Sequence, residues 1–190
     1  DWHQITADPP PQGPEALARA LAQLEGVSAP AAAWEGELLP ARLRYQGADL
    51  DALSLAGAVV WARLGAGPGR RAPVRATPVA RHPRDHAAAW SHLSPRTPDL
   101  ADLTPGARAL LDLLARRGAL FFAELVAQSR LLRAQAEDAL GELVARGLCT
   151  SDGFAGLRAL IGPDARRPRP GAPPPPPGVA PQDRPGRWAR

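Results

Sequence analysis

The chain has 190 residues, with 23 basic and 19 acidic side chains and a formal net charge of +4. Such a length allows one or two small domains. No apolar run is long enough to cross a membrane, which excludes a membrane-spanning segment, and no secretory signal leads the chain. The single cysteine, Cys149, excludes an internal disulfide and favours a reducing compartment, so we expect a cytoplasmic protein.

The charge is unevenly distributed. All basic residues are arginine, and lysine, methionine and asparagine are absent, which indicates a GC-rich coding bias before any selection for arginine chemistry. Because the chain starts at Asp1 without methionine, we expect it to be a piece of a longer protein. Residues 162–190 hold six arginines and two acids, whereas residues 1–161 hold seventeen of each. A neutral body argues against strong autonomous DNA binding.

The first folded unit is predicted over residues 14–81, after a linker at 1–13. Pro14 opens its first helix, where Leu17, Ala20, Leu21 and Leu24 share one face at helical spacing. The later elements are two helices, a strand, a glycine-rich loop and a returning strand, predicted over 30–39, 49–57, 58–64, 65–73 and 74–81.

A connector over 82–103 precedes the second unit, predicted over 104–161. Thr104 followed by Pro105 is a strong helix start, and three helices follow, ending at Gly118, Ser129 and Gly147. The stretch "LCTSDGF" then predicts a strand and a tight hairpin at Asp152-Gly153. Residues 162–187 are a proline-rich, arginine-rich linker without apolar periodicity, and 188–190 are expected to begin a next module.

Three short helices followed by a two-stranded hairpin, twice, is the winged-helix plan. No single helix of this kind can bury its apolar stripe alone, and a hairpin closes the core of three crossing helices. The predicted fold class is therefore mainly α with small β hairpins (α+β), as two tandem winged-helix modules followed by a disordered linker.

No group in the sequence indicates catalysis, a metal or a bound cofactor. His82 and His86 are four residues apart, but Pro83 breaks any helix between them. "GAGPG" lacks the lysine and hydroxyl of a phosphate loop. Cys149 is interpreted as a small core residue. The acids of two helices are interpreted as solvated faces: Glu35, Glu37, Glu137, Asp138 and Glu142.

Arginines are the candidate nucleic-acid contacts. A wing tip could reach phosphates, and the third helix of the second unit could face a groove; these elements carry Arg63, Arg70, Arg71, Arg75, Arg133 and Arg146. A solvated loop is the alternative for the wing. The acids of the third helix favour a packing or protein-contact surface over groove reading. Trp34 and Trp61 fall on inward faces and are assigned to the core, whereas Trp2, Trp90 and Trp188 stay open.

Two long stretches resemble one family. "AAAWEGELLPARLRYQGADLDALSLAGAVVWARL" and "RRGALFFAELVAQSRLLRAQAEDALGELVARGLCTSDGFAGLRAL" are similar to consecutive segments of the C-terminal region of large helicase-related (Lhr) proteins, as is the closing "GRW". Ala58 stands where that family usually has glutamate, and "HPRDHAAAW" matches it weakly.

The resemblance implies a parent that is a superfamily 2, ATP-dependent 3′-to-5′ helicase acting on DNA or RNA–DNA hybrids with a single-stranded tail, in nucleic-acid repair. ATP and Mg²⁺ would bind its upstream motor domains. This piece would belong to a string of winged-helix modules like those of certain DNA glycosylases. No glycosylase acid can be matched here. Two hypotheses remain: a scaffold with auxiliary nucleic-acid contacts and contacts to other modules, or a protein-interaction and oligomerisation module without nucleic acid.

Overall fold

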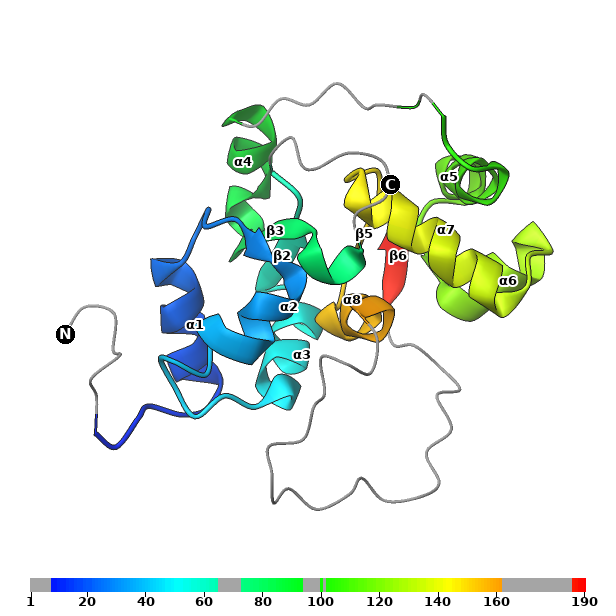
Figure 1. The fold of residues 1–190 in the computed structure, drawn as a ribbon. Coiled ribbons are helices and arrows are strands. Elements are labelled where there is room, and N and C mark those ends of the chain that lie inside the picture. The colour runs from blue at the N-terminus through cyan, green and yellow to red at the C-terminus, as the bar shows by residue number, and fades with distance from the viewer. Residues whose placement is uncertain (1–7, 65–72, 94–99, 101, 162–185) are drawn as a thin grey trace, which may run out of the picture.

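The computed structural model describes residues 8–64, 73–93, 100, 102–161 and 186–190. These residues form mainly helices with two small three-stranded antiparallel sheets, as the predicted α+β class requires. Each sheet and its helices make one lobe, and Figure 1 shows the two lobes on the left and right of the view. We call residues 14–93 the first lobe, and residues 104–161 with 186–190 the second lobe.

The first lobe follows the order helix, strand, helix, helix, strand, strand. Its elements are α1 (Pro14–Gln23), β1 (Ala29–Pro30), α2 (Ala31–Ala33), the π-helix η1 (Trp34–Leu38), α3 (Gly47–Leu55), β2 (Val59–Ala62), the 3₁₀ helices η2 (Val74–Ala76) and η3 (Arg84–His86), β3 (Pro78–Pro83) and α4 (Ala87–Leu93). This order is that of a helix-turn-helix with a β-ribbon. The predicted first helix is confirmed, with Leu17, Ala20 and Leu21 buried along it.

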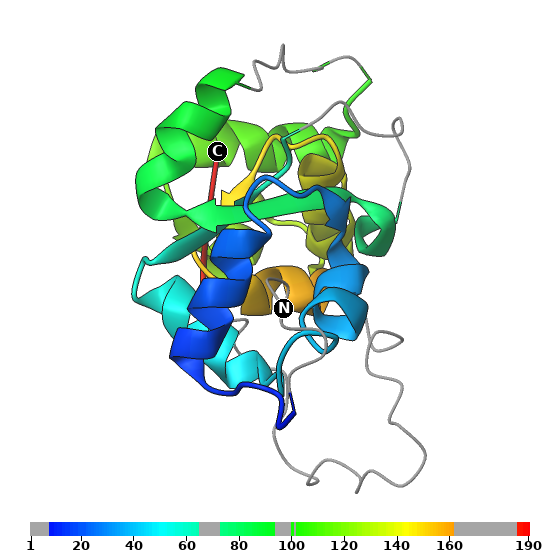
Figure 2. The same cartoon turned by 90° about the vertical axis from the view of Figure 1, so that its left-hand side faces the viewer.

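The sheet of the first lobe has the order β1-β3-β2, with β3 in the centre. Trp61 of β2 lies opposite Arg81 of β3, and Val59 lies opposite Pro83. The strand predicted over 74–81 therefore begins later and runs further, to Pro83. Figure 2 shows the helix α1 at the front of the first lobe, and α3 contacts it.

The second lobe repeats the element order of the first lobe up to its last strand, with the helix α8 inserted before that strand. It contains α5 (Pro105–Arg117), β4 (Leu120–Phe121), α6 (Phe122–Ser129), α7 (Arg133–Ala145), β5 (Thr150–Ser151), α8 (Phe154–Ile161) and β6 (Arg187–Ala189). The predicted helix start is confirmed, because the hydroxyl of Thr104 accepts the backbone N–H of Ala107 at 3.2 Å. The sheet order is β4-β6-β5.

The predicted hairpin at Asp152-Gly153 is wrong. Phe154–Ile161 is the helix α8, and Phe154, Leu157 and Ile161 are buried along it at helical spacing. The strand that pairs with β5 is β6, where Trp188 lies opposite Ser151 on one side and Leu120 on the other. The sequence predicts that residues 188–190 begin a next module. In the structure, Trp188 and Ala189 belong to β6, the central strand of the second lobe's sheet, and Arg190 follows it. The indole of Trp188 is fully buried there.

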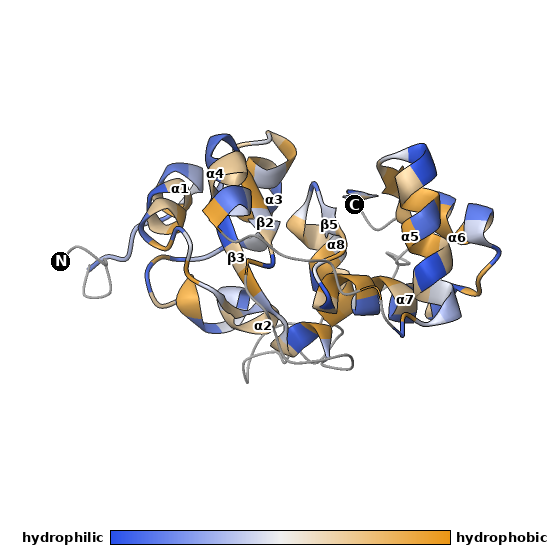
Figure 3. Cartoon of the chain, turned by 90° about the horizontal axis from the view of Figure 1, so that it is seen from above, coloured by the Kyte–Doolittle hydropathy of each residue, from blue (hydrophilic) through white to orange (hydrophobic). Residues whose placement is uncertain are grey.

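The two lobes share one continuous hydrophobic core. Figure 3, seen from above, places β5 and α8 between the helices of the first lobe and those of the second. The edge strands β2 and β5 meet here, where the Thr150 hydroxyl donates to the backbone carbonyl of Trp61 at 2.8 Å. Among the described residues, no helix has the length and apolarity needed to cross a bilayer.

Candidate nucleic-acid interface

The third helix of a helix-turn-helix is the element that usually enters the major groove. In the first lobe this helix is α3, whose charged side chains are Asp49 and Asp51. The carboxylate of Asp51 accepts hydrogen bonds from Arg158 of α8 at 2.9 and 3.1 Å. The helix α3 is therefore acidic and packs against the second lobe. Both properties disfavour the approach of this helix to a phosphate backbone.

In the second lobe the third helix is α7, which is apolar and buried over much of its surface. Gly141 faces the first lobe, where a Cβ on this residue would lie 3.0 Å from a methyl of Val74. Arg133 pairs with Glu137 one turn along at 3.3 Å. These contacts support the interpretation of this helix as a packing surface. Each third helix thus packs toward the other lobe.

The six arginines singled out from the sequence have different surroundings. Arg70 and Arg71 lie outside the described residues. Arg63 and Arg146 are only 8% and 9% exposed. Arg146 pairs with Glu142 at 3.0 Å and donates to the carbonyl of Asp102 at 3.1 Å. Burial withholds these two guanidinium groups from a phosphate backbone, which corrects the expectation that they lie on the ligand surface.

Arg75 and Arg133 are exposed, so a phosphate contact remains a prediction for these two side chains. Arg133 also lies over the ring of Phe122 at 5.1 Å. Arg75 belongs to η2, at the return from the loop between β2 and β3. The predicted wing therefore presents one described, exposed arginine.

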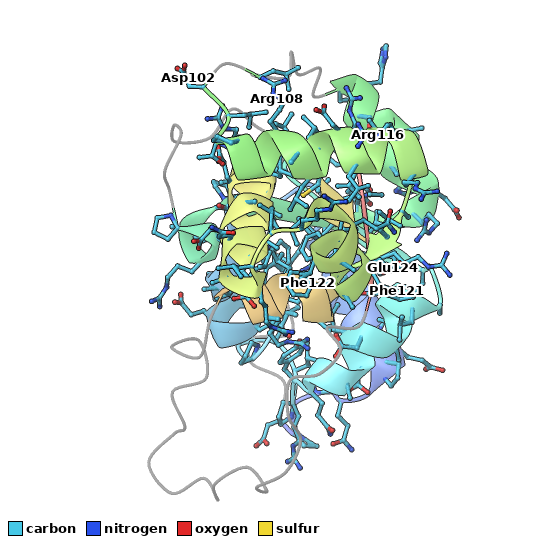
Figure 4. The ribbon with its side chains drawn as sticks, turned by 90° about the vertical axis from the view of Figure 1, so that its right-hand side faces the viewer. Asp102, Arg108, Arg116, Phe121, Phe122 and Glu124 are labelled. Atoms are coloured by element: carbon cyan, nitrogen blue, oxygen red, sulfur yellow. The ribbon has the colours of Figure 1, made fainter. Side chains whose placement is uncertain are left out.

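Other exposed arginines were not singled out from the sequence. Arg108 and Arg116 lie along α5, the helix at the top of Figure 4. Arg84 follows β3, and Arg187 begins β6 and lies over the ring of Phe121 at 5.3 Å. Arginine spacing alone could not reveal this set, because β6 joins the sheet from a distant part of the chain.

An ion-pair network joins the lobes through α8. The guanidinium of Arg158 donates to both oxygens of Glu35 at 2.7 and 2.8 Å and to Asp51, which is a forked, charge-assisted geometry. The phenol of Tyr45 donates to Glu35 as well. Glu35 is only 18% exposed, so its assignment to a solvated helix face is wrong. Burial by itself raises the pKa of Glu35, but Arg158 outweighs it and the pKa lies below its ordinary value.

Arg81 occupies the centre of this junction. Its side chain is 1% exposed and lies over the ring of Phe154 at 3.7 Å and that of Trp34 at 4.9 Å. Burial lowers the pKa of Arg81 to about 10, which leaves the group charged at neutral pH. The guanidinium therefore makes cation–π contacts with two aromatic rings, one from each lobe.

The remaining candidates have structural surroundings. Trp34 and Trp61 are buried, which confirms their assignment to the core. Cys149 is buried and burial raises the pKa of its thiol, which confirms a core role. His82 lies in β3, whereas His86 follows it and contacts Glu25 at 2.6 Å. No cluster of metal-ligating side chains occurs within the part of the chain that the structure describes.

Comparison with known proteins agrees with this architecture. Residues 1–83 match the family model described as "Large helicase-related protein, winged-helix domain". The chain is 34% identical over 160 residues to the Lhr helicase/uracil glycosylase of Escherichia coli, covering 78% of this chain and 10% of that protein. It is also 34% identical over 155 residues to the Lhr helicase/probable uracil glycosylase of Mycolicibacterium smegmatis, with the same coverage. The chain thus spans about a tenth of the length of these curated relatives.

Proposed function

The chain belongs to the large helicase-related family as part of its winged-helix region, and we propose that it is a scaffold with auxiliary nucleic-acid contacts. In this proposal both lobes are winged-helix modules of one longer protein. That protein is an ATP-dependent 3′-to-5′ helicase of the cytoplasm, active in DNA repair on DNA or RNA–DNA hybrids. ATP and Mg²⁺ bind its motor domains, and the residues of this chain take no part in hydrolysis.

The observation that carries the scaffold role is that each third helix packs against the other lobe. α3 is held by Arg158 of the second lobe, and α7 packs on Val74 of the first. The elements that read DNA in an isolated helix-turn-helix are therefore used here to fix one lobe against the other. A fixed pair of lobes can hold a strand in one orientation while a motor elsewhere in the protein translocates.

Nucleic-acid contact then falls to arginines that the packing of the two lobes leaves exposed. Arg75, with Arg70 and Arg71 of the same wing, supplies phosphate contacts that add affinity without reading sequence. Arg133 is a further candidate at the start of α7. Exposed cations on a body that holds as many acids as bases give modest, salt-dependent binding.

Fluorescence anisotropy with a labelled single-stranded oligonucleotide, titrated over a range of salt concentrations, tests this proposal. We expect affinity to fall with salt, with a slope of about −0.7 per neutralised phosphate. Replacement of Arg70, Arg71 and Arg75 by alanine should weaken binding and flatten the slope. Arg19→Ala with Arg44→Ala and Arg117→Ala is the control, because it removes the same charge from three other arginines, which are exposed.

A second candidate function is a protein-interaction or oligomerisation module that binds no nucleic acid. The acidic, ion-paired α3 and the balanced charge of residues 1–161 favour it. Binding that is absent, or that does not change with salt, would support this alternative and refute the first.

A further inference from the structure

A cleft of about 400 Å³ lies where the two lobes meet. Strand β2 and helix α4 of the first lobe form one wall, and β5 with β6 of the second lobe form the other. None of the residues that line it belongs to α3 or α7. The cleft is therefore a feature of the pair of lobes, beside the point where β2 and β5 meet and apart from the two third helices.

The lining combines apolar and polar groups in the way a ligand site does. Val60, Ala62 and Ala189 supply apolar surface, and Ser91 and Thr150 supply hydroxyls. His82 also lines the cleft and is 2% exposed. Its Nδ1 lies 3.0 Å from the carbonyl oxygen of Pro83, which can only accept. Nδ1 therefore carries a proton, and in the neutral ring Nε2 is an acceptor.

Two exposed arginines lie on opposite walls. Arg84 of the first lobe is anchored by its Nε, which donates to the carbonyl of Gly57 at 2.9 Å. Arg187 of the second lobe lies over the Phe121 ring. One carboxylate, Asp152, also lines the cleft, and its Oδ1 accepts the backbone N–H of Arg187 at 2.6 Å. The cationic groups are thus on both sides and the acid is engaged by the backbone.

We propose that this cleft binds one nucleotide of a single-stranded nucleic acid, with the base between the walls and its flanking phosphates on Arg84 and Arg187. The inference rests on the proposed function, since it assumes that the chain contacts nucleic acid. The ligand is single-stranded because a stacked and paired base cannot enter a cleft between two walls. The arginines act as phosphate contacts, whereas the apolar walls receive the flat faces of any base, so sequence preference is weak.

The test combines charge removal with steric blocking. Arg84→Ala with Arg187→Ala should weaken binding of a labelled single strand at least about fivefold and reduce the magnitude of the salt slope by about 1.4, for two phosphates. Arg19→Ala with Arg117→Ala is the control, because it removes the same charge from exposed positions that do not line the cleft. Ala62→Leu narrows the cleft without any change of charge, and thermal unfolding verifies that each variant is folded.

An oligonucleotide with abasic sites distinguishes a base in the cleft from backbone contact alone. We expect it to bind the unmodified chain about tenfold more weakly than the normal strand does, and Ala62→Leu to weaken binding of the normal strand only. If the unmodified chain binds no single strand, the proposed function fails. If it binds with a normal salt slope but the cleft variants match the control, or if Ala62→Leu affects both oligonucleotides equally, the cleft inference fails and the proposed function stands.

Discussion

Arg158→Met is the substitution that tests the junction between the lobes most directly. It keeps the apolar stem of the side chain and removes the charge that Glu35 and Asp51 share. Exposed ion pairs contribute at most about 1 kcal/mol, whereas breaking a buried pair costs about 3–5 kcal/mol. The side chains of Arg158, Glu35 and Asp51 keep 20%, 18% and 30% of their exposure. We therefore expect a loss of about 2–3 kcal/mol in the free energy of unfolding, between these limits.

Urea unfolding followed by far-UV circular dichroism measures this loss. Arg117→Ala, an exposed arginine at the end of α5, is the control and should change the free energy by less than about 0.5 kcal/mol. Adding Glu35→Gln and Asp51→Asn to Arg158→Met should recover part of the loss, because these changes remove the unpaired charges. A loss no larger than that of the control would refute the argument, since the network would then behave as an ordinary surface ion pair.

Four further outcomes follow from the structure. Because the pKa of Glu35 lies below its ordinary value of 4.5, its contribution is present above that pH and is lost as the pH falls below it; acid titration of unfolding should show this loss in the natural chain and not in Glu35→Gln. Gly26→Ala should destabilise by about 1–3 kcal/mol, because φ is 76° and a Cβ would lie 2.2 Å from the Trp90 ring, whereas Gly36→Ala meets nothing within 4 Å and should not destabilise. Trp188→Ala should cost about 3–5 kcal/mol in urea unfolding, and a stability equal to that of the natural chain would show that β6 does not complete the sheet. Cys149 should react with a thiol reagent only when the chain unfolds, and rapid labelling of the native chain would contradict its burial.

Local patterns predicted the elements that are specified by neighbouring residues. The apolar stripe of α1 and the Thr104 cap of α5 each depend on side chains within two turns of one another, and both are as predicted. The errors occur where a partner lies far along the chain. β6 pairs with β5, which lies far earlier in the chain, and Glu35 lies 123 positions from Arg158. The residues next to the central strand and next to the buried carboxylate therefore gave no local pattern from which either could be predicted.

The helix α8 also shows why the Asp-Gly signal misled. Such a pair favours a tight turn, but it does not state which element follows. Phe154, Leu157 and Ile161 carry the helical spacing that identifies α8, and Gly156 allows the Trp188 ring to approach, because a Cβ there would lie 3.0 Å from it. The periodicity after the turn was therefore the better guide than the turn itself.

The network at Arg158 and the cleft both lie between the two lobes, and both are made of residues from each of them. Arg158 holds the first lobe to α8, and α8 begins two residues after Asp152, which lines the cleft. The walls of the cleft come from different lobes, so their separation is fixed only while the junction is intact. A balanced charge count in the body does not oppose ligand binding under these conditions. Arg81 and Arg158 are engaged within the junction, whereas Arg84 and Arg187 stay exposed on the walls. In the proposed binding site, this placement would matter more to a phosphate than the total charge of the body does.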